Sequence, residues 1–135
     1  MNNVTEVRNA AGTLVAYKIG SDLPEGLCAY SKDGDFVQVL SWNYMRGKRL
    51  QSHFHKIVPR DSNLTQEAVV VLKGSMRADV YGTDRTIYNQ TVLKAGECMV
   101  FLADGHGYEI LEDGTRILEI KNGPFPGVEA DKEKF

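Results

Sequence analysis

A chain of 135 residues is long enough to bury the core of one domain and too short for two ordinary domains. Its composition, 42% hydrophobic and 25% charged, is typical of a folded soluble protein and excludes a disordered chain. The formal net charge is -2, with acidic and basic residues spread along the sequence, which argues against a nucleic-acid partner.

The sequence carries no recognisable targeting or membrane signal, and we expect a cytoplasmic protein with no membrane partner. The first residues, Met1 to Glu6, have neither the basic flank nor the apolar run of a secretory signal. No later stretch approaches the roughly 20 apolar residues of a membrane-spanning helix. Cys28 and Cys98 lie far apart in the sequence, so we expect two reduced, half-buried thiols.

Short alternating segments separated by turn residues predict an all-β protein. β-branched and aromatic residues alternate along the chain, and turn signals follow roughly every 8 to 12 residues. This pattern is typical of an antiparallel sandwich or barrel. In chain order, the expected strands are residues 4–8, 14–19, 27–30, 36–44, 47–56, 67–73, 76–81, 86–93, 98–102, 106–110 and 116–121.

Two of the three histidines lie in one expected strand. In an extended strand alternate side chains point to the same face, so His53 and His55 project side by side. Arg49 and Gln51 share their parity, and such a polar face suits a wet pocket better than a hydrophobic core. We interpret Gln51 as a substrate contact and Arg49 as a catalytic residue, with a rim residue paired to an acidic neighbour as the alternative for Arg49.

The third histidine and a glutamate follow the histidine strand in the sequence. Residues 57–66 are polar and contain Pro59, so they predict a loop beside the histidines. That loop leads to Glu67, whose parity matches the apolar residues after it and allows it to face inward. His106 opens a later strand, with Tyr108 next on the same face.

Imidazole nitrogens together with a carboxylate oxygen suit a divalent transition-metal ion such as Fe, Mn, Ni or Zn. The expected ligands of one such ion are His53, His55, Glu67 and His106. A His-x-His pair alone also occurs by chance on solvated strands, but here every histidine of the chain is used. Glu109 and Gln66 are alternatives to Glu67 as the fourth ligand.

Spaced motifs in the sequence resemble those of the cupins, a family of small jelly-roll barrels. The first motif is matched by Gly47, five residues, His53-Phe54-His55, and later Glu67, six residues and Gly74, with eleven residues between His55 and Glu67 where three or four are usual. The second motif is matched by Gly96 and His106, whereas Leu102, Asp104 and Ile110 stand where proline, glycine and asparagine are usual.

The resemblance implies an antiparallel double-stranded β-helix, or jelly-roll barrel, with a metal site. It places the barrel core at about residues 36–121 of a single domain spanning 1–135. Residues 122–135 then form a polar tail of the kind that is often mobile at chain ends. The runs 103–109 and 119–124 are also similar to small bacterial cupins found beside sugar and surface-polysaccharide genes, which implies a carbohydrate-type substrate.

These observations lead to three hypotheses about function. The first is a metal-dependent enzyme on a small polar substrate, of isomerase, epimerase or dioxygenase type, in which Tyr108 donates a proton. A barrel-filling tyrosine is the alternative for Tyr108, and Trp42 is either a substrate contact or a core or interface residue. The second hypothesis is a non-catalytic barrel that binds a sugar or another small molecule. The third is a purely structural or partner-binding protein.

One strand also predicts association with a second copy. Residues 68–72 are apolar on both parities, as is typical of a strand that is covered on both faces. We therefore expect a homodimer.

Overall fold

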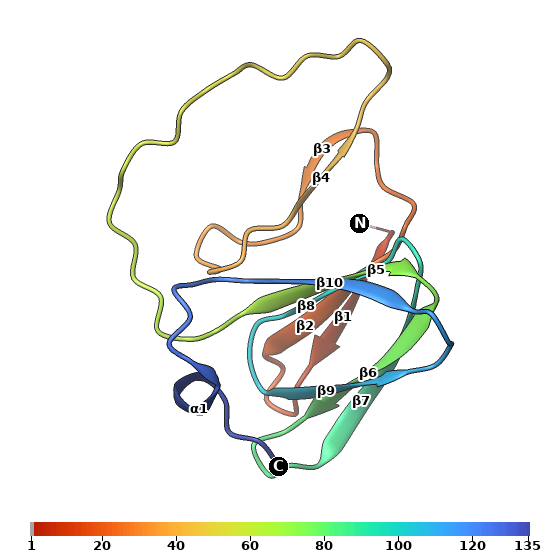
Figure 1. The fold of residues 1–135 in the computed structure, drawn as a ribbon, viewed down its shortest axis with the longest axis vertical. Helices are drawn as coiled ribbons and strands as arrows, with labels where there is room; N and C mark the ends of the chain where they lie inside the picture. Colours follow the sequence, from red (N-terminus) through yellow and green to blue (C-terminus); the bar gives the residue numbers. More distant parts are fainter. Residues whose placement is uncertain (1) are drawn as a thin grey trace.

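The strands build two antiparallel sheets with a hydrophobic core between them (Figure 1). The computed structural model describes residues 2–135. Its elements are β1 (Val4–Arg8), β2 (Leu14–Ile19), β3 (Gly26–Ala29), β4 (Leu40–Asn43), β5 (Glu67–Lys73), β6 (Ser75–Tyr81), β7 (Ile87–Lys94), β8 (Cys98–Phe101), β9 (Gly105–Ile110), β10 (Arg116–Lys121) and the short helix α1 (Val128–Asp131). The prediction of an all-β protein with antiparallel sheets is confirmed.

The core lies between a five-stranded sheet of order β1-β2-β8-β5-β10 and a three-stranded sheet of order β7-β6-β9. Because side chains alternate along a strand, every second residue of β5 and β6 points into this space. The buried residues of this inner core are Val7, Val15, Ala16, Val69, Val71, Met76, Ala78, Val80, Leu93, Met99 and Phe101. Within residues 2–135 the sheets stay separate and do not close into a barrel.

The outer face of the larger sheet is covered in part by the chain itself. Val37, which precedes β4, packs with Ala68 of β5 in a second buried cluster. Leu72, further along the same face of β5, is 54% exposed. The apolar outer face of β5 from which we predicted a homodimer is therefore covered at Ala68 by its own chain and open at Leu72.

The strand expected over residues 36–44 is shorter than predicted. Only Leu40–Asn43 forms a strand, β4, which pairs with β3 in a separate two-stranded sheet. The side-chain oxygen of Gln66 accepts hydrogen bonds from the backbone N–H groups of Phe36 (2.8 Å) and Val37 (3.3 Å). These donors are therefore used by a side chain instead of a neighbouring strand.

Gly74 allows the tight turn between β5 and β6. Its φ is +79°, in the left-handed region that favours glycine. A Cβ at this position would also collide with the Thr115 side chain and would lie 2.9 Å from its Cα. The chain can therefore reverse at this point only with a residue that has no side chain.

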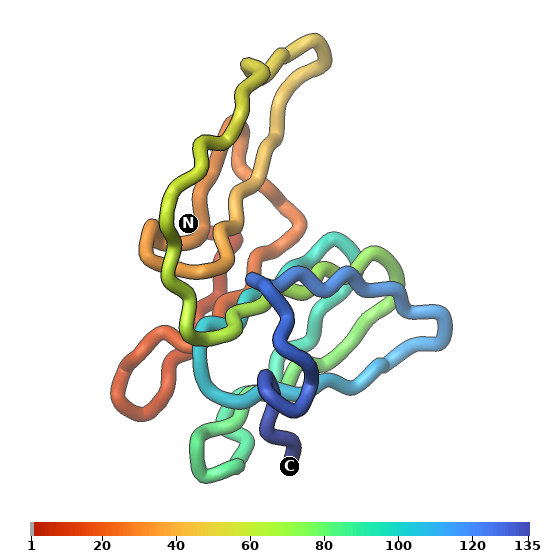
Figure 2. The backbone as a smooth tube through the Cα atoms, turned by 60° about the vertical axis from the view of Figure 1, so that its left-hand side comes forward, coloured from red at the N-terminus to blue at the C-terminus, as the bar shows by residue number. Residues whose placement is uncertain are grey.

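Residues 44–66, which we call the arch, rise away from the sheets between β4 and β5 (Figure 1 and Figure 2). Phe54 and Ile57 in the arch are 99% and 103% exposed. The histidine strand predicted over residues 47–56 is therefore wrong for this conformation. A strand needs a neighbour for its backbone N–H and C=O groups, and in the described part of the chain none lies beside this segment.

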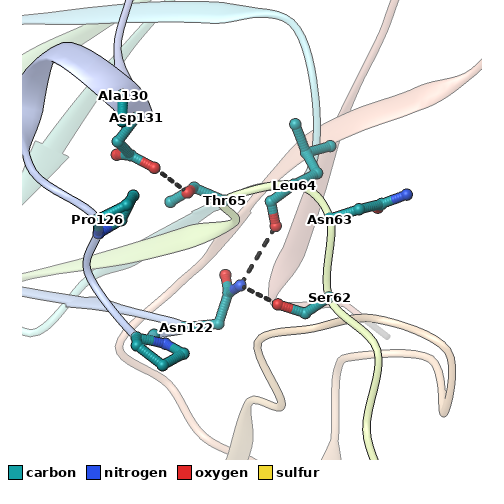
Figure 3. A pocket seen from close by; sticks show the side chains of 10 residues that line it. Ser62, Asn63, Leu64, Thr65, Asn122, Pro126, Ala130 and Asp131 are labelled. Atoms are coloured by element: carbon teal, nitrogen blue, oxygen red, sulfur yellow. Dashed lines mark hydrogen bonds between the residues drawn. The ribbon is translucent and has the colours of Figure 1, made fainter.

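The end of the arch is held by Asn122, which directly follows β10 (Figure 3). Its side-chain N–H group donates to Ser62 Oγ at 3.0 Å and to the Leu64 carbonyl at 3.2 Å. Its side-chain oxygen accepts from the Gln66 backbone N–H at 2.8 Å. Ser62, Leu64 and Asn122 line a small hollow. The bonds also fix the last residues before β5.

The C-terminal tail, predicted to be polar, contacts both the arch and the smaller sheet. Asp131 of α1 accepts a hydrogen bond from the Thr65 hydroxyl. The Phe135 ring packs edge-on against Tyr81 of β6, with ring centroids 5.1 Å apart. The tail therefore runs along the end of the core where β6 ends and β9 begins.

Two further findings concern the membrane and the thiols. Among residues 2–135, no helix combines the length and apolar character needed to cross a bilayer. Cys28 and Cys98, both in the described part of the chain, are not joined in a disulfide. Burial raises the pKa of the Cys98 thiol to about 11, so it is protonated at neutral pH.

Leu93 and its neighbour Val92 give a matched pair for testing the core. Leu93 is fully buried in the inner core, whereas Val92 is 44% exposed on the other face of β7. We expect Leu93→Ala to lower the free energy of unfolding by about 2–5 kcal/mol because it leaves a cavity. Val92→Ala should change it by less than about 1 kcal/mol. Urea unfolding of both variants measures this, and equal losses would contradict the placement of the core.

Candidate functional site

Glu67 places a carboxylate between the two sheets. It is the first residue of β5, where its partners in register are Phe101 of β8 and Lys121 of β10. Because side chains alternate along β5, the Glu67 side chain points inward, as those of Val69 and Val71 do. Its side chain is only 5% exposed, so its charge needs hydrogen-bonding partners inside the protein.

Two residues of the smaller sheet supply these partners. His106 Nε2 lies 2.8 Å from Glu67 Oε1, and the Tyr108 hydroxyl donates to the same oxygen at 2.6 Å. His106 and Tyr108 are alternate residues of β9, held by pairing with Val80 and Ala78 of β6. One carboxylate oxygen thus joins the facing sheets at the end where β5 and β9 begin.

Glu119 of β10 lies close enough to Glu67 for the two carboxyl groups to affect each other's pKa. Burial opposes the charge on Glu67, but hydrogen bonds from His106 and Tyr108 outweigh it and lower the pKa of Glu67 to about 2. Partial burial and the charge of Glu67 raise the pKa of Glu119. Burial and the bond to Glu67 also raise the pKa of Tyr108, which keeps its hydroxyl hydrogen.

The His106 ring packs against aromatic neighbours, and one of its nitrogens has no hydrogen-bond partner among the described residues. It stacks on Phe101 with centroids 4.3 Å apart, and Tyr108 lies 5.4 Å away at a tilt. Its Nδ1 atom is buried and meets no hydrogen-bond partner within residues 2–135. An unpartnered buried polar atom costs on the order of 1–3 kcal/mol. The Nδ1 atom points away from Glu67, because Nε2 is the ring nitrogen that faces the carboxylate.

Glu67 and His106 match part of a transition-metal site. A carboxylate oxygen and an imidazole nitrogen 2.8 Å apart on one interior face are ligand types that such ions prefer. Within residues 2–135, no three His, Cys, Asp or Glu side chains gather into a set that could hold an ion. In this conformation the site therefore offers two of the four expected ligands.

The other two expected ligands lie on the arch. The rings of His53 and His55 have centroids 5.0 Å apart and meet edge to face. His53 Nδ1 lies 3.0 Å from the Gln51 carbonyl oxygen. The two histidines thus remain together, as predicted from their spacing, but the structure does not bring them to Glu67 and His106.

The expected substrate contacts are also away from the interior cluster. Arg49 and Gln51 are exposed on the arch. Trp42 lies on β4, opposite Leu27 of β3, and is 62% exposed. Of the residues expected at the site, the structure brings together Glu67, His106 and Tyr108.

Sequence reasoning missed Glu119 and Phe101 as members of the cluster. Glu119 shares the inward parity of Ile117 in β10, so a charged residue in a core-facing position was the available signal. Phe101 had no such signal, because its contact with His106 depends on how the two sheets face each other.

No match to the chain was found among protein-family models, curated proteins or solved structures.

Two tyrosines that donate to carboxylates allow the cluster to be tested. Tyr108 donates to the buried Glu67, whereas Tyr88 donates to the more exposed Asp104 at 2.7 Å. We expect Tyr108→Phe to lower the free energy of unfolding by about 1.5–3 kcal/mol, as for a hydrogen bond to a buried charge. Tyr88→Phe should cost less than about 1 kcal/mol. Urea unfolding in the presence of a chelator compares them, and a larger loss for Tyr88→Phe would argue against the cluster.

Proposed function

We propose that this chain is a metal-binding protein of cupin type that acts as a metal-dependent enzyme on a small polar or carbohydrate-type substrate. The observation that carries the proposal is the interior cluster of Glu67, His106 and Tyr108. It combines a buried carboxylate with an imidazole nitrogen and a protonated hydroxyl that both contact one of its oxygens. Titratable groups with strongly shifted pKa values in a buried site are typical of catalytic and binding centres.

The open edge of β9 offers a place for the two missing ligands. In the described part of the chain β9 pairs with β6 on one side only, so its other edge can accept a further strand. The arch segment 47–56 alternates polar and apolar residues as a half-buried strand does. Pairing of this segment with β9 would extend the three-stranded sheet to four strands.

An antiparallel pairing with β9 would bring the histidines beside His106. All strand pairs within residues 2–135 are antiparallel, and β9 runs from Gly105 to Ile110. The C-terminal part of an antiparallel neighbour therefore lies at the beginning of β9, beside His106. His53 and His55 are in that part of the segment. Their shared parity lets both face the interior.

A bound divalent transition-metal ion, Fe, Mn, Ni or Zn, would supply Lewis-acid chemistry on a carbonyl or a pair of hydroxyl groups, as isomerases and epimerases use. Tyr108, whose hydroxyl donates to Glu67, would supply a proton to the substrate as general acid. Arg49 and Gln51 share the parity of the histidines and would face the same space once the segment is paired.

A binding protein without catalysis is the second candidate, and one contact favours it. The Tyr108 hydroxyl is already committed to Glu67 at 2.6 Å, which suits a fixed structural donor. In that case the metal ion would serve as a clamp for a sugar or another small polar ligand.

The metal site is tested by elemental analysis of the purified protein after dialysis against Ni²⁺. We expect about one ion per chain for the wild type, as for a single transition-metal site. Glu67→Gln and His106→Ala should abolish binding, and His53→Ala with His55→Ala should weaken it at least about tenfold. Glu109→Gln is the matched control, because Glu109 lies on the other face of β9 and pairs with Arg77. Unchanged ion content in all variants would overturn the proposal.

Catalysis and binding are separated by Tyr108→Phe. Small sugars and hydroxy-carbonyl compounds would first be screened for an increase in the melting temperature of the metal-loaded wild type. If the protein is an enzyme, the variant should keep the metal and the ligand but lose turnover about 10²–10⁴-fold, as for a missing general acid. Equal turnover of wild type and variant would remove the assigned role, and binding without any turnover would favour the second candidate.

A further inference from the structure

We propose that two copies of this chain exchange their arches, so that each site combines Glu67 and His106 of one copy with His53 and His55 of the other. The inference rests on the proposed metal site and adds the partner that completes it. The partner is a second copy because the same chain carries both halves of the contact, an open strand edge and an unpaired segment. A two-fold arrangement satisfies both halves in both copies at once.

The body of the protein is complete without the arch. The residues of both buried clusters all lie outside residues 44–66. Side chains 44–64 are exposed throughout. Two large apolar side chains of the arch, Met45 and Phe54, are 84% and 99% exposed. Such exposed apolar side chains are typical of a surface that a partner covers.

The arch points away from the β9 edge of its own chain. Figure 1 and Figure 2 share their vertical axis, and in both the crest of the arch lies at one end while β9 lies toward the other. The arch is tied at one end by β4 and at the other by Asn122. Exchange lets the arch keep this outward course, whereas closure on its own β9 would require it to swing past the larger sheet.

The interior cluster shows what the partner must supply. His106 Nε2 and Glu67 Oε1 lie 2.8 Å apart, and within residues 2–135 no third His, Cys, Asp or Glu side chain completes a set that could hold an ion. The exposed pair His53 and His55 is already preassembled, with rings 5.0 Å apart. A second copy that pairs its segment 47–56 with β9 delivers both imidazoles together.

Complementation between two inactive variants tests the exchange. One variant carries His53→Ala and His55→Ala, and the other carries Glu67→Gln and His106→Ala. The two are mixed in equal amounts, unfolded in urea, refolded together and dialysed against Ni²⁺. We expect neither variant alone to reach stoichiometric nickel. The mixture should recover about one quarter of the wild-type content, because half of randomly formed two-fold dimers are mixed and each holds one intact site.

Each other outcome has a distinct meaning. A mixture that binds no more nickel than its components, beside a wild type with one ion per chain, overturns the exchange and leaves the metal site intact. A wild type that binds no nickel, or an arch variant that binds as much as the wild type, overturns the proposed metal site and the exchange with it. Circular dichroism shows whether each variant is folded.

A covalent link gives a second test that does not depend on metal. In a background of Cys28→Ala and Cys98→Ala, Phe54→Cys and Gly107→Cys place one thiol on the arch and one on β9, both on the face opposite the histidines. Gly107 tolerates a Cβ, whose nearest heavy atom would lie 3.5 Å away. Oxidation should give a covalent dimer on a non-reducing gel. A monomeric product with an internal link would overturn the exchange.

Discussion

The buried carboxylate of Glu67 is the constraint on which the arrangement of the two sheets depends. A charged side chain with 5% exposure is costly inside a protein unless hydrogen bonds satisfy it. Its partners, His106 and Tyr108, come from the opposite sheet and reach the same oxygen. Apolar residues alone would tolerate small shifts between the sheets, whereas these short bonds fix one register.

The same bonds explain how a polar cluster can occupy the end of an apolar core. Glu119, an exposed residue of β10, adds a second carboxyl beside Glu67, and partial desolvation and the charge of Glu67 raise its pKa. The stacked Phe101 ring holds His106 in place without using its second nitrogen. The side chains of Glu67, His106 and Tyr108 are therefore held in fixed positions relative to one another.

Local patterns predicted most of the strands because alternation and turn residues act over a few positions. They also predicted the inward face of Glu67 and the shared face of His106 and Tyr108, since parity follows from the strand alone. The strand over residues 47–56 could not be decided in this way, because its existence depends on a neighbour that the sequence does not specify. The strand predicted over residues 36–44 is shorter in the structure because Gln66, which is distant in sequence, accepts hydrogen bonds from the backbone N–H groups of Phe36 and Val37.

Under the proposed function, the state of the arch would link ligand binding to folding. Ordering one backbone residue costs about 1–2 kcal/mol, so pairing segment 47–56 with β9 carries a substantial entropic penalty. In the proposed metal-bound state, backbone hydrogen bonds along the β9 edge would offset part of it, and coordination by His53 and His55 would supply the rest. Because the rings of these histidines already lie 5.0 Å apart, the second ligand would bind with little further loss of freedom. Under this proposal arch pairing and completion of the site are one coupled equilibrium, and the ion affinity is lower than that of a preformed site by the cost of ordering the arch.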